Sequence, residues 1–219
     1  MQYAISILLS GVSLGGQYAL IAIGYTMVYG ILRLINFAHG DVFMVAGLMM
    51  VYLTASLPLA ASIPLVLVLT VLLGFIIERA AYKPLREAPR MSVMISAIGV
   101  SYLLQNLATY VTGGLPKMYP EIPGISNTIT IAGVPTKVVT VVTPVLVLVL
   151  VLALTQLIHH TKVGMAMRAV AKDFETAQLM GIKINAVISV TFIIGSFLAA
   201  VGSVLYFTNY QSLSLIHIS

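Results

Sequence analysis

The stretch INFAHGD, residues 35–41, places three polar side chains, Asn36, His39 and Asp41, between two long apolar segments. In a membrane-spanning helix an ionisable group costs about 2.5–3.5 kcal/mol, so Asp41 is expected at an interface, in a water-lined cavity or in a pair. One interpretation is a helix broken inside the membrane, where exposed backbone and a half-helix N-terminus can bind a zwitterion. The other is an ordinary cytoplasmic turn, in which Asn36 or Asp41 caps a helix. The residues alone leave both open.

A second polar pair, Gln105-Asn106, lies inside the apolar run 91–112. Amide side chains within a span either hydrogen-bond to a neighbouring helix, which is their more frequent use, or line a polar pathway. Both interpretations stay open here. Gln105 and Asn106 therefore join the three side chains of INFAHGD as candidates for a translocation path.

Patterns that could indicate enzyme chemistry are weak in this chain. GVSLG, residues 11–15, fits G-x-S-x-G around Ser13, but that motif belongs between a strand and a helix, and here it lies in an apolar helical run. An intramembrane serine hydrolase would also need His39, the one histidine near the membrane, to face Ser13. His159-His160 lacks a third ligand at metal spacing, and the chain has no cysteine. We therefore expect no catalytic residue and no metal site.

The composition indicates a membrane protein, because 60% of the residues are hydrophobic and only 8% are charged. Soluble domains have about a quarter of their residues charged. Five segments carry no charged residue: 1–32, 42–77, 91–116, 138–161 and 184–219. Each is longer than the roughly 20 residues of a membrane-spanning helix. VLVLVLVLAL, residues 145–154, is apolar on every face and lacks the alternation of a β-barrel strand.

These segments predict an all-α, polytopic transmembrane bundle with about six spans. The expected spans are 4–32, 42–57, 63–77, 91–112, 139–158 and 184–207. The first is either one tilted helix or a short segment followed by a span. Four Lys or Arg residues lie in 78–90 and four in 159–183, which places both loops in the cytoplasm and the Gly- and Pro-rich loop 113–138 on the periplasmic side. The same distribution explains the net charge of +5 without a nucleic-acid partner.

The second cytoplasmic loop contains an amphipathic segment bracketed by Gly164 and Gly181. Its apolar residues recur at spacings of three and four, which predicts one helix with one apolar stripe: Met167, Val170, Phe174 and Ala177. Gly181 is placed to end this helix in left-handed geometry. Such a helix can lie on lipid headgroups, remain solvated without a partner, or dock into a groove on another protein. Periodicity does not separate the three.

Residues 175–181, ETAQLMG, resemble the cytoplasmic-loop signature of ATP-binding-cassette importer permeases, which reads Glu-Ala-Ala, three variable residues, Gly. The chain departs from the signature only at Thr176. Four longer stretches resemble the branched-chain amino acid permeases of these importers, of the Leu/Ile/Val type, over about residues 10–210. They are ALIAIGYTMVYGILRLINFAHGD (19–41), ERAAYKPLR (78–86), SAIGVSYLLQN (96–106) and GMAMRAVAKDFETAQLMGI (164–182).

The resemblance implies a transporter subunit of the bacterial cytoplasmic membrane that is not itself an enzyme. Its implied partners are a homologous second permease, two cytoplasmic ATPases that hold ATP and Mg²⁺, and a periplasmic binding protein that delivers the amino acid. The amphipathic segment would then be the coupling helix, with the coupling-loop positions Gly164, Arg168, Glu175, Ala177 and Gly181. No cofactor is expected on this chain, which also lacks a G-x-x-x-x-G-K-[ST] motif.

A channel or secondary carrier that needs no ATPase is the alternative, with Asp41 as the one intramembrane acid for ion coupling. Relatives of this type that carry urea or short amides leave the substrate open. The resembling permeases continue into further Gly-rich spans. We therefore expect residues 1–212 to form an incomplete permease domain and LSLIHIS, residues 213–219, to be a non-native tail.

Overall fold

The computed structural model describes residues 2–86, 88–131, 134–210 and 212–213, so residues 214–219 of the expected tail lie outside the described part. The helices are α1 (Gln2–Leu32), α2 (Ala38–Ser56), α3 (Leu59–Ile77), the π-helix η1 (Glu78–Tyr82), the 3-10 helix η2 (Lys83–Leu85), α4 (Arg90–Thr112), α5 (Val138–His160), α6 (Lys162–Lys172), α7 (Phe174–Leu179) and α8 (Ile184–Asn209). The strands are β1 (Lys117–Met118), β2 (Thr128–Ile131), β3 (Val134–Lys137) and β4 (Ser212–Leu213).

Six helices of the described chain are long and apolar enough to cross a membrane, which confirms the predicted all-α bundle. They are α1, α2, α3 extended to Leu85, α4, α5 and α8. The first is one unbroken helix and not a short segment followed by a span. The third begins earlier than expected, because Pro58 sits at its N-cap and Pro64 is accommodated inside the helix. The chain is therefore a multi-pass membrane protein.

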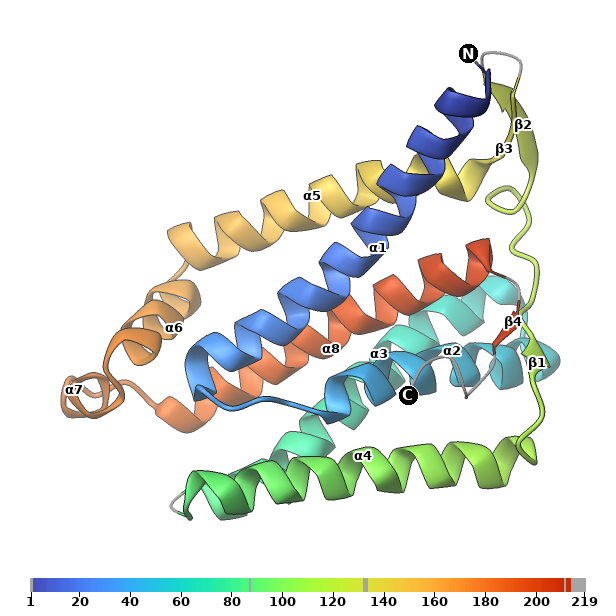
Figure 1. Cartoon of the computed structure of the whole chain (residues 1–219). Coiled ribbons are helices and arrows are strands. Elements are labelled where there is room, and N and C mark those ends of the chain that lie inside the picture. Colours follow the sequence, from blue (N-terminus) through green and yellow to red (C-terminus); the bar gives the residue numbers. More distant parts are fainter. Residues whose placement is uncertain (1, 87, 132–133, 211, 214–219) are drawn as a thin grey trace.

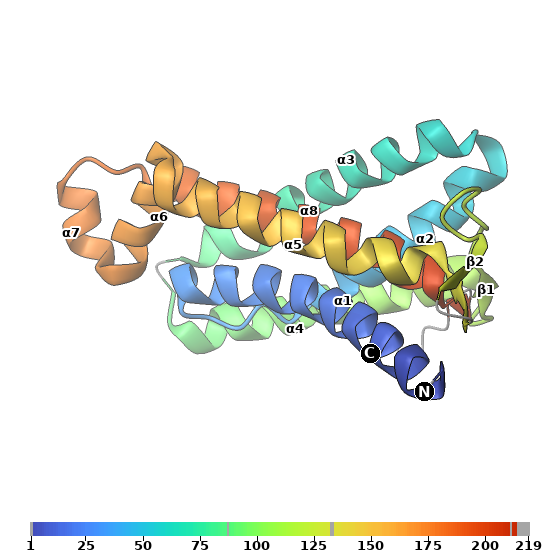
Figure 2. The same ribbon diagram turned by 90° about the horizontal axis from the view of Figure 1, so that it is seen from above.

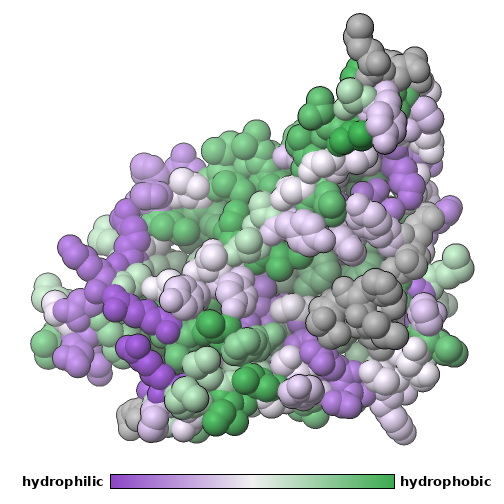
Figure 3. Space-filling model, viewed as in Figure 1, coloured by the Kyte–Doolittle hydropathy of each residue, from purple (hydrophilic) through white to green (hydrophobic). Residues whose placement is uncertain are grey.

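Helix α8 occupies the centre of the bundle and packs against α1, α2 and α3. Helix α5 lies along α1, and α4 lies along α2, at opposite sides of the bundle (Figures 1 and 2). The short helices α6 and α7 project at one end, whereas the hairpin β2–β3 and the start of α1 lie at the other end. Hydrophilic side chains gather over α6 and α7, and apolar side chains cover the exposed helices between the ends (Figure 3).

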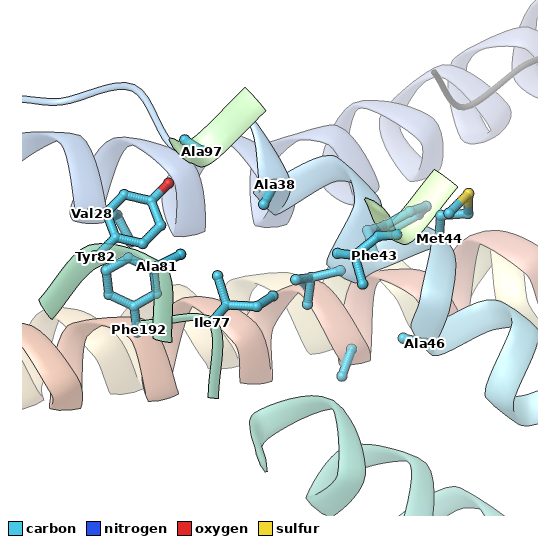
Figure 4. Close-up of a cluster of buried hydrophobic side chains, with 14 of the residues drawn as sticks. Val28, Ala38, Phe43, Met44, Ala46, Ile77, Ala81, Tyr82, Ala97 and Phe192 are labelled. Atoms are coloured by element: carbon cyan, nitrogen blue, oxygen red, sulfur yellow. The ribbon is translucent and has the colours of Figure 1, made fainter. Parts of the chain in front are cut away.

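The core between α8, α2 and α3 is built from small and aromatic side chains (Figure 4). Tyr82 packs against Phe192 with ring centroids 5.0 Å apart, and Phe43 packs against Phe207 at 5.7 Å. Glycines bring α1 and α8 close together. A Cβ added at Gly195 would lie 3.4 Å from the carbonyl oxygen of Gly24. Close backbone approach of this kind is typical of helix pairs in membranes.

The loop 113–138 contains structure that the sequence did not predict. Strands β2 and β3 form an antiparallel hairpin, in which Thr128 pairs with Lys137 and Ile131 with Val134. The short strand β1 pairs with β4, so that Lys117 lies opposite Leu213. The hairpin leads directly into α5, since β3 ends at Lys137 and α5 begins at Val138. The Val138 N–H donates to the carbonyl of Asn127 at 2.9 Å, which ties the start of α5 to the hairpin.

The loop 78–90 is also more regular than expected. Helix α3 continues as η1, where the Lys83 N–H bonds to the carbonyl of Glu78, five residues back, and then as η2. Pro84 explains the change of helix type, because it has no N–H and its ring clashes with the carbonyl four residues earlier in an α-helix. Glu78 and Tyr82 are therefore carried into the bundle and do not lie in a solvated loop.

Candidate functional site

The segment 33–37 interrupts the chain between α1 and α2. Arg33 ends α1 with a left-handed φ of 52°, and its N–H donates to the carbonyl of Tyr29 at 2.7 Å. The N-cap of α2 is Phe37, with no side-chain cap, so neither Asn36 nor Asp41 has the capping role that the turn interpretation gave them. Asp41 instead lies in the first turn of α2, where a helix dipole favours an acidic side chain.

This interruption lies well inside the length of the spans. A Cβ added at Gly24 of α1 would be 2.9 Å from the ring of His39, so His39 is level with Gly24. Gly24 precedes the end of α1 by eight residues, which corresponds to about 12 Å along the axis. Figure 1 shows the connection returning from the end of α1 towards the middle of the bundle before α2 begins. The geometry therefore favours the broken helix over a turn at the helix ends.

Asp41 and Gln105 are brought together across α2 and α4. The Gln105 Nε2 donates to Asp41 Oδ1 at 3.0 Å and to Ser101 Oγ at 3.2 Å. Asp41 is only 4% exposed. Gln105 is fifteen residues from the start of α4 at Arg90, about 22 Å along its axis. The Ser101 hydroxyl also bonds to Asp41, so a carboxylate is held deep in the bundle by two neutral donors.

Asn36 and His39 join the same region, but Asn106 does not. The Tyr82 hydroxyl donates to Asn36 Oδ1 at 2.7 Å. His39 is 3% exposed, and its Nε2 has no hydrogen-bond partner in the described part of the chain. Asn106 is exposed on α4 and donates to the carbonyl of Tyr102, one turn back, at 2.7 Å. Of the five residues, four therefore surround the break, and Asn106 faces outward.

The amphipathic segment of the loop 159–183 forms two helices, so the prediction of one helix between Gly164 and Gly181 is wrong. Asp173 adopts an extended conformation and ends α6, and its carboxylate accepts hydrogen bonds from the N–H groups of Glu175 and Thr176 at 3.1 and 3.2 Å. The Thr176 hydroxyl also donates to the Asp173 carboxylate. This bond is the largest cause of the lowered pKa of Asp173. Asp173 therefore ends α6 and acts as the N-cap of α7.

Glycines fix both ends of this loop, residues 161–183, which is called the coupling loop from here on after its predicted role. A Cβ at Gly164 would overlap the carbonyl oxygens of Leu157 and Ile158, because α6 starts directly against the last turn of α5. Gly181 has a φ of 82°, as predicted for the residue after a helix. Its N–H donates to the carbonyl of Gln178, and the Ile182 N–H donates to that of Ala177. This pair of bonds is the Schellman motif.

The remaining coupling-loop candidates divide into exposed and buried side chains. Glu175 is exposed on α7, and Arg168 contacts His159 Nδ1 at 3.2 Å on the surface. Ala177 is buried and packs into the main core. Leu179 and Met180, which the sequence analysis did not select, are 87% and 79% exposed at the tip of the loop. Two exposed apolar side chains beside a glutamate form a surface that can meet another protein.

A buried polar cluster at the start of α8 was also missed. Glu78 is fully buried, forms an ion pair with Arg86, and accepts a hydrogen bond from the Ser189 hydroxyl at 2.9 Å. Arg86 also donates to the side chain of Asn185. The one signal in the sequence is Glu78 itself, an acid placed directly after a long apolar run.

The geometry rules out the serine hydrolase alternative. His39 packs against Gly24, eleven residues beyond Ser13 on α1, so about 16 Å along the helix axis separate the two. The Ser13 hydroxyl has no hydrogen-bond partner among the described residues. Among these residues the structure also contains no group of three side chains placed to hold a metal ion.

Comparison with known proteins identifies the family. Residues 7–217 match the family model described as branched-chain amino acid transport system / permease component. The chain is similar to the high-affinity branched-chain amino acid transport system permease protein LivH of Escherichia coli K12, with 40% identity over 93% of this chain and 70% of the relative. The LivH protein of Salmonella typhimurium is 41% identical and the BraD protein of Pseudomonas aeruginosa 38% identical over the same shares. No solved structure matches. The chain, with its six membrane-spanning helices, therefore belongs to the family of branched-chain amino acid transport permeases.

Proposed function

We propose that this chain is the membrane-spanning permease subunit of an ATP-binding-cassette importer for branched-chain or similar small amino acids. The observation that supports this most directly is the coupling loop. It projects from one end of the bundle and presents Glu175, Leu179 and Met180 to the outside, while Ala177 packs into the core. A loop with an exposed tip and a buried base can transmit movement of a partner to the spans.

The proposed partners follow from the family. Two ATPase subunits would bind the coupling loop and hold ATP and Mg²⁺, a homologous second permease would complete the membrane domain, and a periplasmic binding protein would deliver the substrate. Residues 78–90 and the coupling loop would face the cytoplasm, and residues 113–138 the periplasm of a bacterial inner membrane. The grouping of hydrophilic side chains around α6 and α7 supports this orientation (Figure 3).

The break between α1 and α2 is the proposed translocation path. The N–H groups of the first turn of α2 carry partial positive charge, which suits the carboxylate of an amino acid. Asp41 supplies a negative charge for its ammonium group, and Asn36, His39 and Gln105 supply neutral polar atoms. Asn106 faces outward, and we assign it to the part of the path that a second permease would complete.

The function is tested by reconstituting the chain in liposomes with the ATPases, the second permease and the binding protein from its source genome. Uptake of labelled leucine is measured with ATP or a non-hydrolysable analogue inside the liposomes. We expect uptake only with hydrolysable ATP and binding protein together. Uptake that is equally fast without ATP would replace the importer with a channel or secondary carrier, and an assembled complex that moves no amino acid would overturn the proposal.

A further inference from the structure

Four side chains tie the end of α3 to the start of α8. Both carboxylate oxygens of Glu78 are engaged, one with Arg86 and the other with the Ser189 hydroxyl at 2.9 Å. Arg86 uses a second nitrogen to donate to Asn185. The group formed by Glu78, Arg86, Asn185 and Ser189 is called the clamp. Because Glu78 is fully buried and its ion pair is only partly solvated, the clamp is a structured polar contact and not a surface ion pair.

The clamp contacts the first two turns of α8, directly after the coupling loop ends. Asn185 is the second residue of α8, and Ser189 lies one turn further on. The Schellman motif at Gly181 locks α7 to the chain that leads into α8, through the Gly181 and Ile182 N–H bonds of 3.0 and 3.1 Å. If α7 moves, the first two turns of α8 are therefore expected to move with it. These turns contain Asn185 and Ser189, which bond to Arg86 and Glu78.

The other side of η1 contacts the break. Tyr82 lies in the same π-helical segment as Glu78, donates its hydroxyl proton to Asn36 Oδ1 at 2.7 Å, and packs its ring on Phe192 of α8 (Figure 4). One five-residue segment thus contacts both the start of α8 and the polar residues of the break. π-helical turns are rare and occur frequently at functional sites.

Stability alone does not explain a buried ion pair, since apolar side chains of similar volume often stabilise a protein as well or better. We propose that the clamp and Tyr82 form the mechanical link that transmits movement of the coupling loop to the break between α1 and α2. Glu78, Arg86 and Tyr82 are positioning residues in this proposal. It rests on the proposed importer function, and it assigns a role to residues that touch neither the ATPase nor the substrate.

The test measures ATP hydrolysis and leucine uptake together in the reconstituted transporter and compares the number of molecules moved per ATP. We expect Glu78→Gln and Tyr82→Phe to leave ATP hydrolysis near the wild-type rate and to lower uptake per ATP by about 5- to 150-fold, the range of typical coupling energies. Tyr82→Phe keeps the ring that packs on Phe192 and removes only the bond to Asn36. Glu121→Gln makes the same chemical change as Glu78→Gln in the loop 113–138, and should keep the wild-type ratio.

Ser189→Ala is a milder variant in case Glu78→Gln does not assemble, because it removes one hydroxyl and leaves the ion pair. If the two side chains act in one mechanical link, their effects on uptake per ATP are expected not to add. The losses caused by Ser189→Ala and Tyr82→Phe should then be non-additive in the double variant, although the two side chains lie on different elements. Wild-type ratios in both single variants, or additive losses in the double variant, would overturn the link. A wild-type complex that shows no ATP-dependent uptake would instead overturn the importer function.

Discussion

The Asp41 carboxylate accepts a hydrogen bond from the Gln105 amide at 3.0 Å, and this contact joins the first turn of α2 to the middle of α4. The two residues are far apart in sequence, and each is polar within an apolar run. Because Asp41 is nearly inaccessible, its carboxylate needs hydrogen-bond donors, and the Gln105 amide supplies one beside the Ser101 hydroxyl. The pair therefore holds the start of α2 in place beside the break.

Replacing Gln105 with leucine should destabilise the protein. The variant leaves the buried carboxylate without its amide donor, a loss of about 1–3 kcal/mol. Asn106→Leu is the matched control, because Asn106 is exposed and, among the described residues, its side chain bonds only to the Tyr102 carbonyl within its own helix. Thermal unfolding in detergent should show a clear fall in Tm for Gln105→Leu and little change for Asn106→Leu. Equal Tm values would mean that the Asp41–Gln105 contact carries no stability.

A methyl group at position 164 should displace the coupling loop. In Gly164→Ala the new Cβ overlaps the carbonyl oxygens of Leu157 and Ile158, which belong to the backbone and cannot rotate away, so overpacking should cost about 1–3 kcal/mol. Gly99→Ala in α4 is the control, since nothing lies within 4 Å of its added Cβ and alanine is the better helix former. We expect lower Tm and weaker ATPase binding only for Gly164→Ala. Normal ATPase binding by this variant would show that α6 can shift without consequence.

Hydropathy and charge were enough to predict the six spans, because a span must be apolar along its whole length. The left-handed Gly181 was also predictable, since a glycine after a helical stripe commonly ends a helix. The sequence analysis missed that α6 ends at Asp173, although Asp is a preferred N-cap residue. The apolar spacing of Val170, Phe174 and Ala177 continued across Asp173 and indicated one helix. Met167, Val170 and Ala177 of the predicted stripe are buried, but Phe174, directly after the capping residue, is 43% exposed. A single capping residue can therefore interrupt a helix that the apolar spacing alone predicts to be continuous.

The site could be predicted only in part. Asn36, His39, Asp41 and Gln105 were selected as candidates because polar residues stand out in apolar runs. The pairing of Asp41 with Gln105 and of Asn36 with Tyr82 depends on contacts between distant segments. A single sequence does not encode these contacts in any local pattern. Glu78 was assigned to a cytoplasmic loop for the same reason, because its partner Ser189 lies in the distant helix α8.

The cap of α7 should depend on pH. The Thr176 hydroxyl, followed by the N–H groups of Thr176 and Glu175, lowers the pKa of Asp173 in the folded protein. A depressed pKa means that the carboxylate stabilises α7 at pH values above its unfolded pKa of about 3.9, and that this stabilisation is lost as the pH falls through the folded pKa. Hydrogen exchange of the Glu175 and Thr176 amides, corrected for intrinsic rates, should show protection falling in acid. Asp173→Asn should remove this dependence while keeping a capping side chain, and an unchanged profile in the variant would assign it to another group.

The contact between α1 and His39 should control the position of the break. In Gly24→Ala the added Cβ would lie 2.9 Å from the His39 ring and 3.2 Å from the carbonyl of Gly195, so either His39 or α8 must move. Gly30→Ala on the same helix meets nothing within 4 Å and serves as the control. We expect Gly24→Ala to lower stability by about 1–3 kcal/mol, as overpacking does, and to lower leucine uptake more than Gly30→Ala does. Because His39 is the side chain nearest to Gly24, combining Gly24→Ala with His39→Ala should restore part of the lost stability by making room. A double variant with no recovery would show that the strain falls on α8 and not on the break.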